Sequence, residues 1–384
     1  MFIYSSWYVA ATDREVEPDK VLARTILGEP IALYRKTDGS VAALRDQCCH
    51  RLAPLSLGAV VDDTLRCGYH GFRFDGAGRC VEIPGQAKIP SRAKVRAYPI
   101  IERYGFVWIW MGNPELAGDD STIPDALRVL NQPGWDSRAS YVHVKSGYRL
   151  IVDNLQDASH AEYVHLKTLR VVGMGEAMRK SDKVPERSYR FELVNGHIQH
   201  HWRVLNAPGG PSFVKGLCLQ NGLDYEALKA KPVDWTLETV WYPPVVWTFN
   251  PTTMLSGAKP ETAATWTNVI AITPETESTT HYFWADAQSF NPKDGRIAEF
   301  YHKATQEAFA EDVVVFEAQQ RRIGSGDVMD FDVVTVSGDT ASVQARRILN
   351  ALKAKEVDYA PEQDRPALTR APELPPKNGL VRSP

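Results

Sequence analysis

The 384-residue sequence predicts an α+β protein in which an all-β unit precedes a larger unit of strands and long helices. Two hairpin signals, Thr37-Asp38-Gly39-Ser40 and Asp75-Gly76-Ala77-Gly78, each separate short apolar segments within the first hundred residues. Two stretches with helical patterning, residues 297–322 and 341–355, lie near the end of the chain. Strands that come first and long helices that come last indicate two units of different class.

A boundary between the two units is expected near residue 115. Residues 105–110 are aromatic and β-branched, as is typical of a closing strand, and Met111-Gly112-Asn113-Pro114 then ends the pattern. The sequence therefore predicts one unit over 1–115, a second over 116–355, and a Pro-rich tail over 356–384. We expect that tail to be extended and packed on a surface, or disordered.

Helix and strand patterns alternate within the second unit. Helical periodicity covers residues 150–165, and strand-like segments follow at 236–242 and 265–272. Glycines and prolines over 208–216, together with Gly173 and Gly175, predict mobile loops over the entrance to a site. Several large aromatic residues either line an apolar cavity for a planar ring or belong to the core. They are Trp241, Tyr242, Trp247, Trp266 and Trp284.

The charge balance excludes a general nucleic-acid binder, because 44 Lys and Arg residues against 47 Asp and Glu residues give a net charge of −3. No stretch reaches the roughly 18 uninterrupted apolar residues that a membrane span requires. The first residues lack the basic segment of a secretory signal, and five cysteines do not form a disulfide framework. We therefore expect a cytoplasmic protein whose thiols are metal ligands or buried residues.

Two pairs of cysteine and histidine carry the first metal-binding signal. Cys48 and His50 form a C-x-H pair, and Cys67 and His70 form a C-x-x-H pair after sixteen intervening residues. Two Cys and two His can hold one tetrahedral zinc, but structural zinc sites have C-x₂₋₄-C and H-x₃₋₅-H spacings. The arrangement fits a [2Fe–2S] cluster better, with both thiolates on one iron and both imidazoles on the other. Neutral imidazoles raise the reduction potential of such a cluster.

A second metal site is indicated by His160 and His165 in the predicted helix over 150–165. Five residues at about 100° each put two side chains about 140° apart on a regular α-helix, which is too far apart to bind one metal. We therefore expect the helix to end, or to contain a π-like turn, between the two histidines.

Asp312 is the candidate third ligand, because it lies on an apolar helix face. Its neighbours at i−4, i−3, i+3 and i+4 are Ala308, Phe309, Val315 and Phe316. A carboxylate in such surroundings is unfavourable unless it is paired or bound to a metal. Glu311 and Glu317 have more polar neighbours and are expected to be solvated. Two histidines and one carboxylate form the facial triad of non-haem Fe(II) oxygenases, which leaves positions open for O₂ and substrate.

The motifs together resemble those of the Rieske non-haem iron oxygenases. The cysteine and histidine pairs resemble the Rieske domain, and residues 153–165 resemble a D-x-x-D-x-x-H-x(4)-H stretch with Asn154 in place of the first acid. The likeness is to the branch of the vanillate and dicamba O-demethylases and toluenesulfonate methyl-monooxygenase, and it extends from residue 1 to about 355. It implies an all-β Rieske domain followed by a helix-grip catalytic domain, an antiparallel sheet with helices. Cys49 stands where the family usually has proline, and Cys49 and Cys80 are expected to be free thiols.

The resemblance implies the terminal oxygenase component of a monooxygenase. A separate reductase or ferredoxin would pass electrons from NADH or NADPH to the cluster. Iron held by His160, His165 and Asp312 would then use O₂ to hydroxylate or O-demethylate a small aromatic substrate. In the family the oxygenase subunits form a head-to-tail homotrimer, in which the cluster of one subunit lies near the iron of the next.

Two further residues take roles from the same resemblance. Asp157 would bridge His70 of the partner subunit to one of its own iron-ligating histidines and orient these rings; its alternative is a helix-surface acid. Asn154 is either a hydrogen-bond partner near the iron or a helix N-terminal cap.

Other functions use the same residues. An aromatic cis-dioxygenase, an N-demethylase and an aryl-methyl hydroxylase would hold the same metal centres, whereas a Rieske electron carrier would hold only the cluster. The chain is much longer than a carrier requires, and a carrier would leave the second set of metal ligands unexplained.

Overall fold

The computed structural model describes residues 2–118, 120–168 and 187–356 of the chain. The strands of the N-terminal part are β1 (Trp7–Thr12), β2 (Val21–Ile26), β3 (Glu29–Arg35), β4 (Val41–Arg45), β5 (Ala59–Val61), β6 (Thr64–Arg66), β7 (Arg73–Phe74), β8 (Cys80–Glu82), β9 (Ala97–Tyr98), β10 (Ile100–Arg103) and β11 (Phe106–Trp110). The later strands are β12 (Asp136–Val144), β13 (Arg187–Val194), β14 (His197–Pro208), β15 (Pro232–Tyr242), β16 (Val246–Leu255), β17 (Ala264–Thr265), β18 (Thr267–Thr276) and β19 (Thr279–Gln288). The α-helices are α1 (Tyr148–Leu155), α2 (Ala161–Val164), α4 (Pro211–Asn221), α5 (Tyr225–Leu228), α6 (Gly295–Ile323) and α7 (Thr340–Ala354).

Among the described residues, three small antiparallel sheets form the N-terminal part, with strand orders β1-β11-β10, β2-β3-β4-β9 and β5-β6-β7-β8. The predicted turn at Thr37-Asp38-Gly39-Ser40 joins β3 to β4, and the turn at Asp75-Gly76-Ala77-Gly78 joins β7 to β8. The aromatic segment predicted as a closing strand is β11, which is buried throughout and pairs with β1 and β10. The all-β prediction for this part is confirmed.

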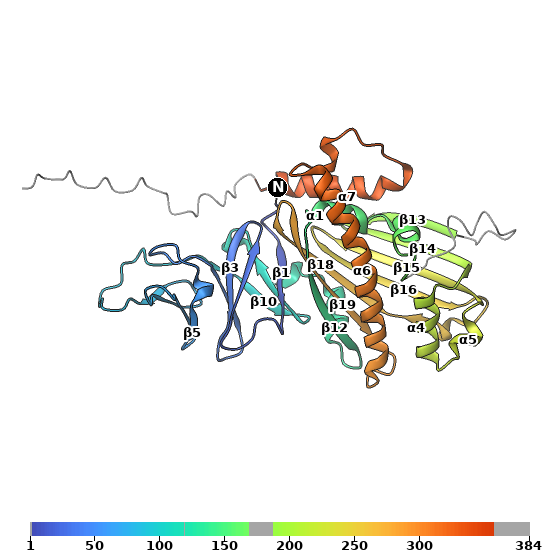
Figure 1. Ribbon diagram of the computed structural model, residues 1–384, viewed down its shortest axis with the longest axis horizontal. Coiled ribbons are helices and arrows are strands. Elements are labelled where there is room, and N and C mark those ends of the chain that lie inside the picture. The colour runs from blue at the N-terminus through green and yellow to red at the C-terminus, as the bar shows by residue number, and fades with distance from the viewer. Residues whose placement is uncertain (1, 119, 169–186, 357–384) are drawn as a thin grey trace, which may run out of the picture.

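Within the described part of the chain, the second half builds one antiparallel sheet in the order β12-β19-β18-β16-β15-β14-β13, with β17 beside β16. The strand-like segments predicted over 236–242 and 265–272 fall in β15 and in β17 and β18. The long helices predicted over 297–322 and 341–355 correspond to α6 and α7. Helix α6 crosses one face of the sheet, and α1 packs against α7 near the end of α6 (Figure 1). The α+β class is therefore confirmed.

The two parts share one hydrophobic core. It contains Trp108 of β11 together with Trp241 of β15 and other side chains of the large sheet. The Thr273 hydroxyl in β18 also donates a hydrogen bond to the Val9 carbonyl in β1, at 2.7 Å. Because the core is continuous, packing fixes the orientation of the N-terminal part against the large sheet.

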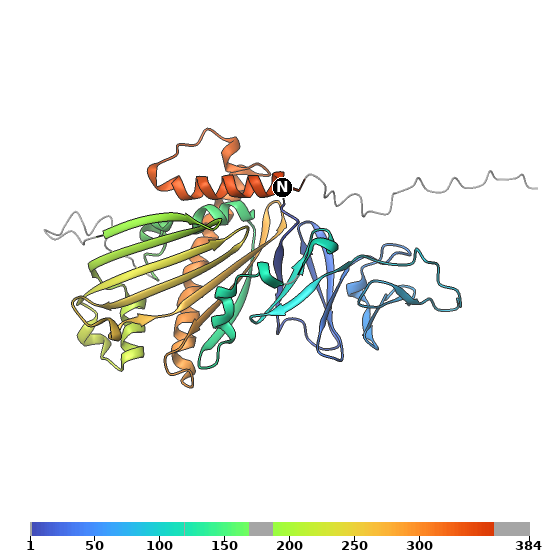
Figure 2. The ribbon, with the colours of Figure 1, turned by 180° about the vertical axis from the view of Figure 1, so that it is seen from behind.

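The β5–β8 sheet occupies one end of the molecule, and α4 and α5 occupy the other (Figures 1 and 2). The sheet that contains β1 and β11 lies between the β5–β8 sheet and the large sheet (Figure 2). No helix in the described residues is both long and apolar enough to cross a bilayer. Of the predicted tail, residues 357–384 lie outside the described residues.

Candidate metal centres and substrate cavity

The candidate cluster ligands lie in two matching turns next to the β5–β8 sheet. Cys48 and His50 follow β4, and Cys67 and His70 follow β6. In each turn the N–H four residues after the cysteine donates to the cysteine carbonyl, at 3.0 Å in the first turn and 3.1 Å in the second. Both cysteines are buried and both histidines are exposed, with ring centroids 4.6 Å apart. Two buried thiols behind two exposed imidazoles fit a cluster whose electron leaves through the imidazole side.

The neighbouring residues support these turns. Gly71 follows His70 with φ +74°, and a Cβ atom there would lie 2.9 Å from Cγ of Pro84, so only glycine fits without displacement. Burial is the main reason that the pKa of the Cys67 thiol is raised. Cys49 and Cys80 are free thiols, as predicted.

The two histidines of the second site do not share one continuous helix. Helix α1 ends at Leu155, a 3-10 turn covers Ala158–His160, and α2 spans Ala161–Val164. His160 therefore precedes α2, and His165 follows it with φ −94° and ψ 36°, outside the helical region. The expected continuous helix over 150–165 is interrupted before His160, and the predicted end between the two histidines is found at Val164, where α2 ends. This break lets both rings turn toward one point.

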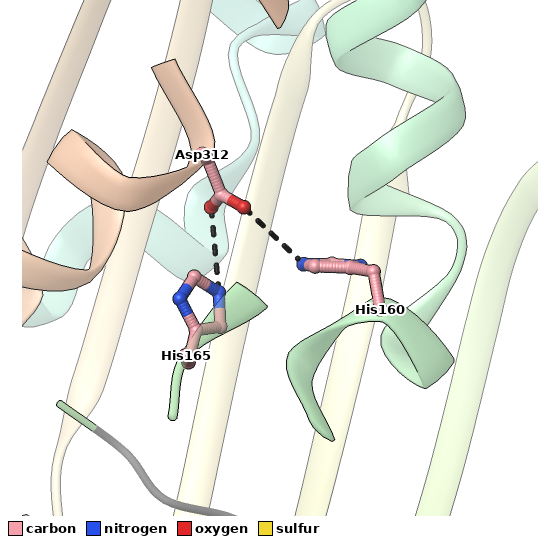
Figure 3. Close-up of side chains that lie close together, drawn as sticks. All are labelled: His160, His165 and Asp312. Carbon is pink, nitrogen blue, oxygen red and sulfur yellow. Dashed lines mark ion pairs between the residues drawn. The ribbon is translucent and has the colours of Figure 1, made fainter. Parts of the chain in front are cut away.

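That point is the Asp312 carboxylate, which α6 supplies from the opposite side (Figure 3). Nε2 of His160 lies 3.5 Å from Oδ1 of Asp312, and Nε2 of His165 lies 3.5 Å from Oδ2. One candidate ligand atom from each residue lies within 4.8 Å of the others. These separations are longer than good hydrogen bonds and suit three ligands that share one ion at roughly 2 Å from each.

The surroundings of Asp312 test whether a metal fits. The side chain is 6% exposed, and burial raises its pKa, although the two histidines act in the opposite direction. A buried carboxylate that is held apart from two imidazoles is unfavourable by itself and is stabilised by a divalent cation. The donor set of two imidazoles and one carboxylate is that of the non-haem iron triad.

A second layer of contacts points both Nε2 atoms toward the carboxylate. Nδ1 of His160 contacts the backbone carbonyl oxygen of Asp157. Nδ1 of His165 lies 3.0 Å from Oε2 of Glu311, and the same oxygen accepts a 2.7 Å hydrogen bond from the Thr168 hydroxyl. Such partners fix the tautomer and the ring orientation of metal-binding histidines.

The prediction from the sequence that Glu311 is solvated is therefore wrong. Its side chain is only 19% exposed, because the segment that carries His165 and Thr168 packs over this part of α6. Glu317 is also partly covered, and its Oε1 accepts a 3.2 Å hydrogen bond from the Lys145 N–H. The sequence pattern of α6 identifies neighbours within that helix only. Residues of other segments cover both glutamates.

We expect Glu311→Gln to weaken iron binding by about 10- to 100-fold, because the variant loses the charged acceptor that holds the His165 ring. Iron retained after dialysis against a chelator measures the effect, with the visible cluster spectrum as an internal reference. Glu307→Gln, an exposed acid one turn earlier on α6, is the control. Equal iron retention in the two variants would contradict this role for Glu311.

Asn154 and Asp157 lie on either side of the break after α1. Asn154 belongs to the last turn of α1, whose N-cap is Gly147, so the N-cap alternative for Asn154 is wrong. Its Nδ2 lies 3.4 Å from Oδ1 of Asp312, close to the triad. Asp157 is half-buried in the turn before His160, and its Oδ1 accepts a 2.8 Å hydrogen bond from the Ser159 N–H. The alternative of Asp157 as a helix-surface acid is also wrong, because Asp157 lies outside both helices.

A cavity of about 180 Å³ lies between α6 and the large sheet and reaches all three triad residues. Ligand sites for drug-sized molecules measure roughly 300–1,000 Å³, so this cavity suits a small molecule. Its wall is largely apolar and includes several aromatic side chains, among them Trp202, Phe213, Phe249, Trp266, Phe300 and Phe309.

The structure shows which of the five aromatic residues named in the sequence line the cavity and which belong to the core. Trp266 lines the cavity. Trp241, Trp247 and Trp284 are buried in the main core, and Tyr242 packs against it. The cavity residues Trp202 and Phe213 were missed by the sequence analysis, because the side of a strand or helix that faces the cavity depends on α6.

The predicted loops over the site entrance are partly wrong. Residues 211–216 belong to α4, in which Gly216 packs so closely on α6 that a Cβ atom would lie 2.5 Å from the Tyr301 hydroxyl oxygen. Here glycine permits a close helix–helix approach instead of a mobile loop. Gly173 and Gly175 lie outside the described residues.

A buried histidine, His200, also lines the cavity. Its Nε2 lies 2.7 Å from Oε1 of Gln156, and its Nδ1 lies 3.0 Å from the Tyr189 hydroxyl. Burial lowers the pKa of His200 to about 4. His200 is therefore a neutral side chain in the folded protein at neutral pH.

This burial predicts an acid sensitivity of the fold. The pKa of His200 is lower in the folded state than the roughly 6.5 of an unfolded chain, so its contribution to stability is complete above pH 6.5 and is lost as the pH falls toward 4. Between pH 7 and pH 5 we expect this histidine to lower the free energy of unfolding by about 2 kcal/mol. Urea unfolding of the wild type and His200→Gln at both pH values tests this. An identical pH dependence in the two proteins would rule it out.

Comparison with known proteins finds two family models that match most of this chain. Residues 6–99 match the family model described as Rieske [2Fe-2S] domain, and residues 144–355 match the Vanillate O-demethylase oxygenase C-terminal domain. The iron–sulfur subunit of the toluene-4-sulfonate monooxygenase system of Comamonas testosteroni is 33% identical over 94% of this chain and 100% of its own length. The oxygenase component of dicamba O-demethylase of Stenotrophomonas maltophilia is 35% identical over 92% of this chain and 99% of its own length.

Solved structures also match this chain over most of its length. The crystal structure of dicamba monooxygenase bound to 3,6-dichlorosalicylic acid superimposes with a TM-score of 0.82 at 32% identity, and covers 93% of this chain and 99% of that chain. Another structure of that enzyme contains non-haem iron and dicamba. A protein of this family uses a Rieske cluster and a non-haem iron, and takes its electrons from a separate reductase. The chain belongs to the Rieske non-haem iron oxygenases and is an oxygenase component related to the vanillate and dicamba O-demethylases.

Proposed function

We propose that this oxygenase component hydroxylates or O-demethylates a small aromatic substrate held next to an iron bound by His160, His165 and Asp312. The observation that carries the proposal is the aromatic cavity of about 180 Å³ that reaches these three residues. Its size and apolar wall suit one substituted ring. The named relatives, toluene-4-sulfonate monooxygenase and dicamba O-demethylase, support an aromatic substrate.

We propose that Cys48, His50, Cys67 and His70 bind the Rieske cluster. When bound, the iron supplies activation of O₂ with electrons that the cluster passes on from the reductase. The chain positions the substrate and excludes water with the aromatic wall. Asn154 holds the Asp312 carboxylate from the side of α1. Hydroxylation of a methoxy carbon would give a hemiacetal, which collapses to a phenol and formaldehyde.

We propose that the oxygenase is a head-to-tail homotrimer, in which electrons cross between subunits through Asp157. Within one chain the β5–β8 sheet and its cluster turns lie beyond the β1–β11 sheet from α1 and α6, which carry Asn154 and Asp312 (Figure 1). Leu57 and Tyr69 are 78% and 64% exposed in the segments that carry the cluster ligands, and such apolar exposure favours a protein partner there. Asp157 is half-buried three residues before His160, a position from which it can connect the iron site to a partner.

The extent of the two domains and the cellular location belong to the same proposal. We assign residues 1–115 to the Rieske domain and 116–355 to the catalytic domain. None of the five cysteines, all of which lie in the described residues, forms a disulfide, which supports the cytoplasm as the location.

A substrate screen tests the proposed function. We expect substrate-dependent O₂ uptake with at least one class among methoxybenzoates, aryl sulfonates and N-methyl aromatic compounds, in the presence of NADH and a compatible reductase. Formaldehyde in a 1:1 ratio to O₂ would identify demethylation, whereas a cis-diol without formaldehyde would show a ring dioxygenase. Metal analysis of the same preparation should give about three irons and two sulfides per chain. Two irons and no O₂ uptake would leave only an electron carrier.

A further inference from the structure

A buried carboxylate lies behind the cavity wall, away from the triad. Asp286 of β19 is 3% exposed. Its Oδ1 accepts hydrogen bonds from Nδ2 of Asn268 at 3.0 Å and from the Thr305 hydroxyl at 2.8 Å, and its Oδ2 lies 3.2 Å from Nδ1 of His302. Nε2 of His302 lies 2.7 Å from the Ser140 hydroxyl, which leaves Nδ1–H to donate to Asp286. Asn268 and Thr305 line the cavity.

These hydrogen bonds determine which donors and acceptors of the cavity wall remain available to a ligand. Burial raises the pKa of Asp286, whereas the hydrogen bonds from His302, Thr305 and Asn268 lower it and favour the carboxylate. A carboxylate only accepts hydrogen bonds, so the Thr305 hydroxyl proton and one of the two amide protons of Asn268 are committed to Asp286. The Thr305 oxygen is then left to the cavity as an acceptor only, so a substrate group that binds to it must donate. Asn268 keeps one N–H and its Oδ1, and can pair with either kind of group.

The position of Thr305 along α6 matches a ring that spans the cavity. Thr305 precedes Asp312 by seven residues, which is about 10.5 Å along the axis and within roughly 20° of the same helix face. The group to be oxidised lies at the Asp312 end, and the group that donates lies at the Thr305 end. The substrate therefore has two functional ends.

The charge near the cavity wall also favours a neutral substrate group. The Asp286 carboxylate lies directly behind the Thr305 hydroxyl, so a negative substrate group at this wall would meet like charge in a poorly solvated place. No Lys or Arg lies among the described residues that line the cavity. Gln156 presents an unpartnered buried Nε2 to the cavity, which is a neutral donor suited to an ether or carbonyl oxygen.

We propose that the substrate is an uncharged aromatic compound with a hydroxyl or amide N–H donor at the end remote from the oxidised group, and that Thr305 selects it against aryl carboxylates and sulfonates. This inference rests on the proposed function, since it assumes an aromatic substrate in this cavity. It assigns Thr305 as the specificity residue, and Asp286 as the positioning residue that orients its hydroxyl.

Three probes of similar shape separate charge from donor capacity. 4-Methoxybenzamide donates and is neutral, methyl 4-methoxybenzoate is neutral without a donor, and 4-methoxybenzoate is an anion. Tryptophan quenching in the anaerobic holoenzyme reports binding without turnover, because Trp202 and Trp266 line the cavity. We expect the amide to bind at least tenfold more tightly than either of the other probes.

Substitutions of Thr305 then test whether this residue causes the preference for the amide. Thr305→Val should reduce the preference for the amide over the ester by about tenfold, whereas Thr305→Ser should keep it. Thr253→Val is the matched control, since Thr253 is a buried threonine of β16 whose hydroxyl has no partner among the described residues. An unchanged preference in Thr305→Val would overturn the role of Thr305.

The outcomes distinguish this inference from the proposed function. Binding of the carboxylate as tightly as the amide, or of the ester as tightly as the amide, overturns the inference, and formaldehyde from any of the three probes then still supports the demethylase. Failure of all three to bind overturns the inference, and absence of turnover in the wider screen of aromatic compounds is needed to overturn the function.

Discussion

Replacing Asp312 with alanine is expected to abolish turnover while the visible spectrum of the cluster stays intact. Asp312 is the carboxylate of the proposed triad, with a histidine nitrogen 3.5 Å from each of its oxygens. Its loss leaves two imidazoles that cannot hold the iron against dissociation. Since a bound metal contributes several kcal/mol to transition-state stabilisation, the rate should fall by about a thousandfold or more.

Iron analysis gives this experiment a readout that is separate from activity. The variant should contain about two irons per chain, both in the cluster, in place of about three. Glu307→Ala, an exposed acid on the same helix, is the control and should keep the full iron content. Turnover and three irons in Asp312→Ala would move the third ligand to another residue.

Replacing Asp157 with asparagine should slow electron delivery by about 10- to 100-fold and leave substrate binding almost unchanged. Asparagine keeps the size of the side chain and a carbonyl oxygen that can accept from the Ser159 N–H. The backbone carbonyl that contacts His160 is also kept, so iron binding should persist. The substitution removes the negative charge of Asp157, which we propose connects the iron site to the partner subunit.

Stopped-flow oxidation of the reduced cluster under single-turnover conditions measures this effect. Substrate affinity and iron content, determined on the same sample, separate slow electron transfer from a damaged site. Asp157→Glu, which keeps the charge, should recover part of the rate. A wild-type rate of cluster oxidation in Asp157→Asn would remove Asp157 from the electron route.

The sequence predicted best where the chemistry is local. The spacing of Cys48, His50, Cys67 and His70 lies within two short turns, and the structure has two turns closed by equivalent hydrogen bonds. The angle between His160 and His165 on a regular helix predicted that a helix ends between them, and the short α2 does end at Val164, directly before His165. In both cases a constraint on a few neighbouring residues is enough.

The errors share one cause. Glu311 was expected in solvent because only its neighbours on α6 were visible, and the segment after α2 covers it. Gly216 was expected in a loop because glycine usually interrupts helices, and its close contact with Tyr301 explains why it lies within one. Each error concerns a contact between segments that are distant in the sequence.

The sequence by itself predicted the two candidate ligand sets, and it determined the α+β class and the carboxylate that lies beside the two histidines, because periodicity, spacing and the cost of an unpaired buried charge act locally. Only the tertiary structure decided which aromatic side chains line the cavity and which lie in the core. It also brought Asp286 of β19 behind Asn268 of β18 and Thr305 of α6. The physical reason is that an enclosed wall forms only when strands and a helix pack together, and the direction of each hydrogen bond then depends on a partner from another element.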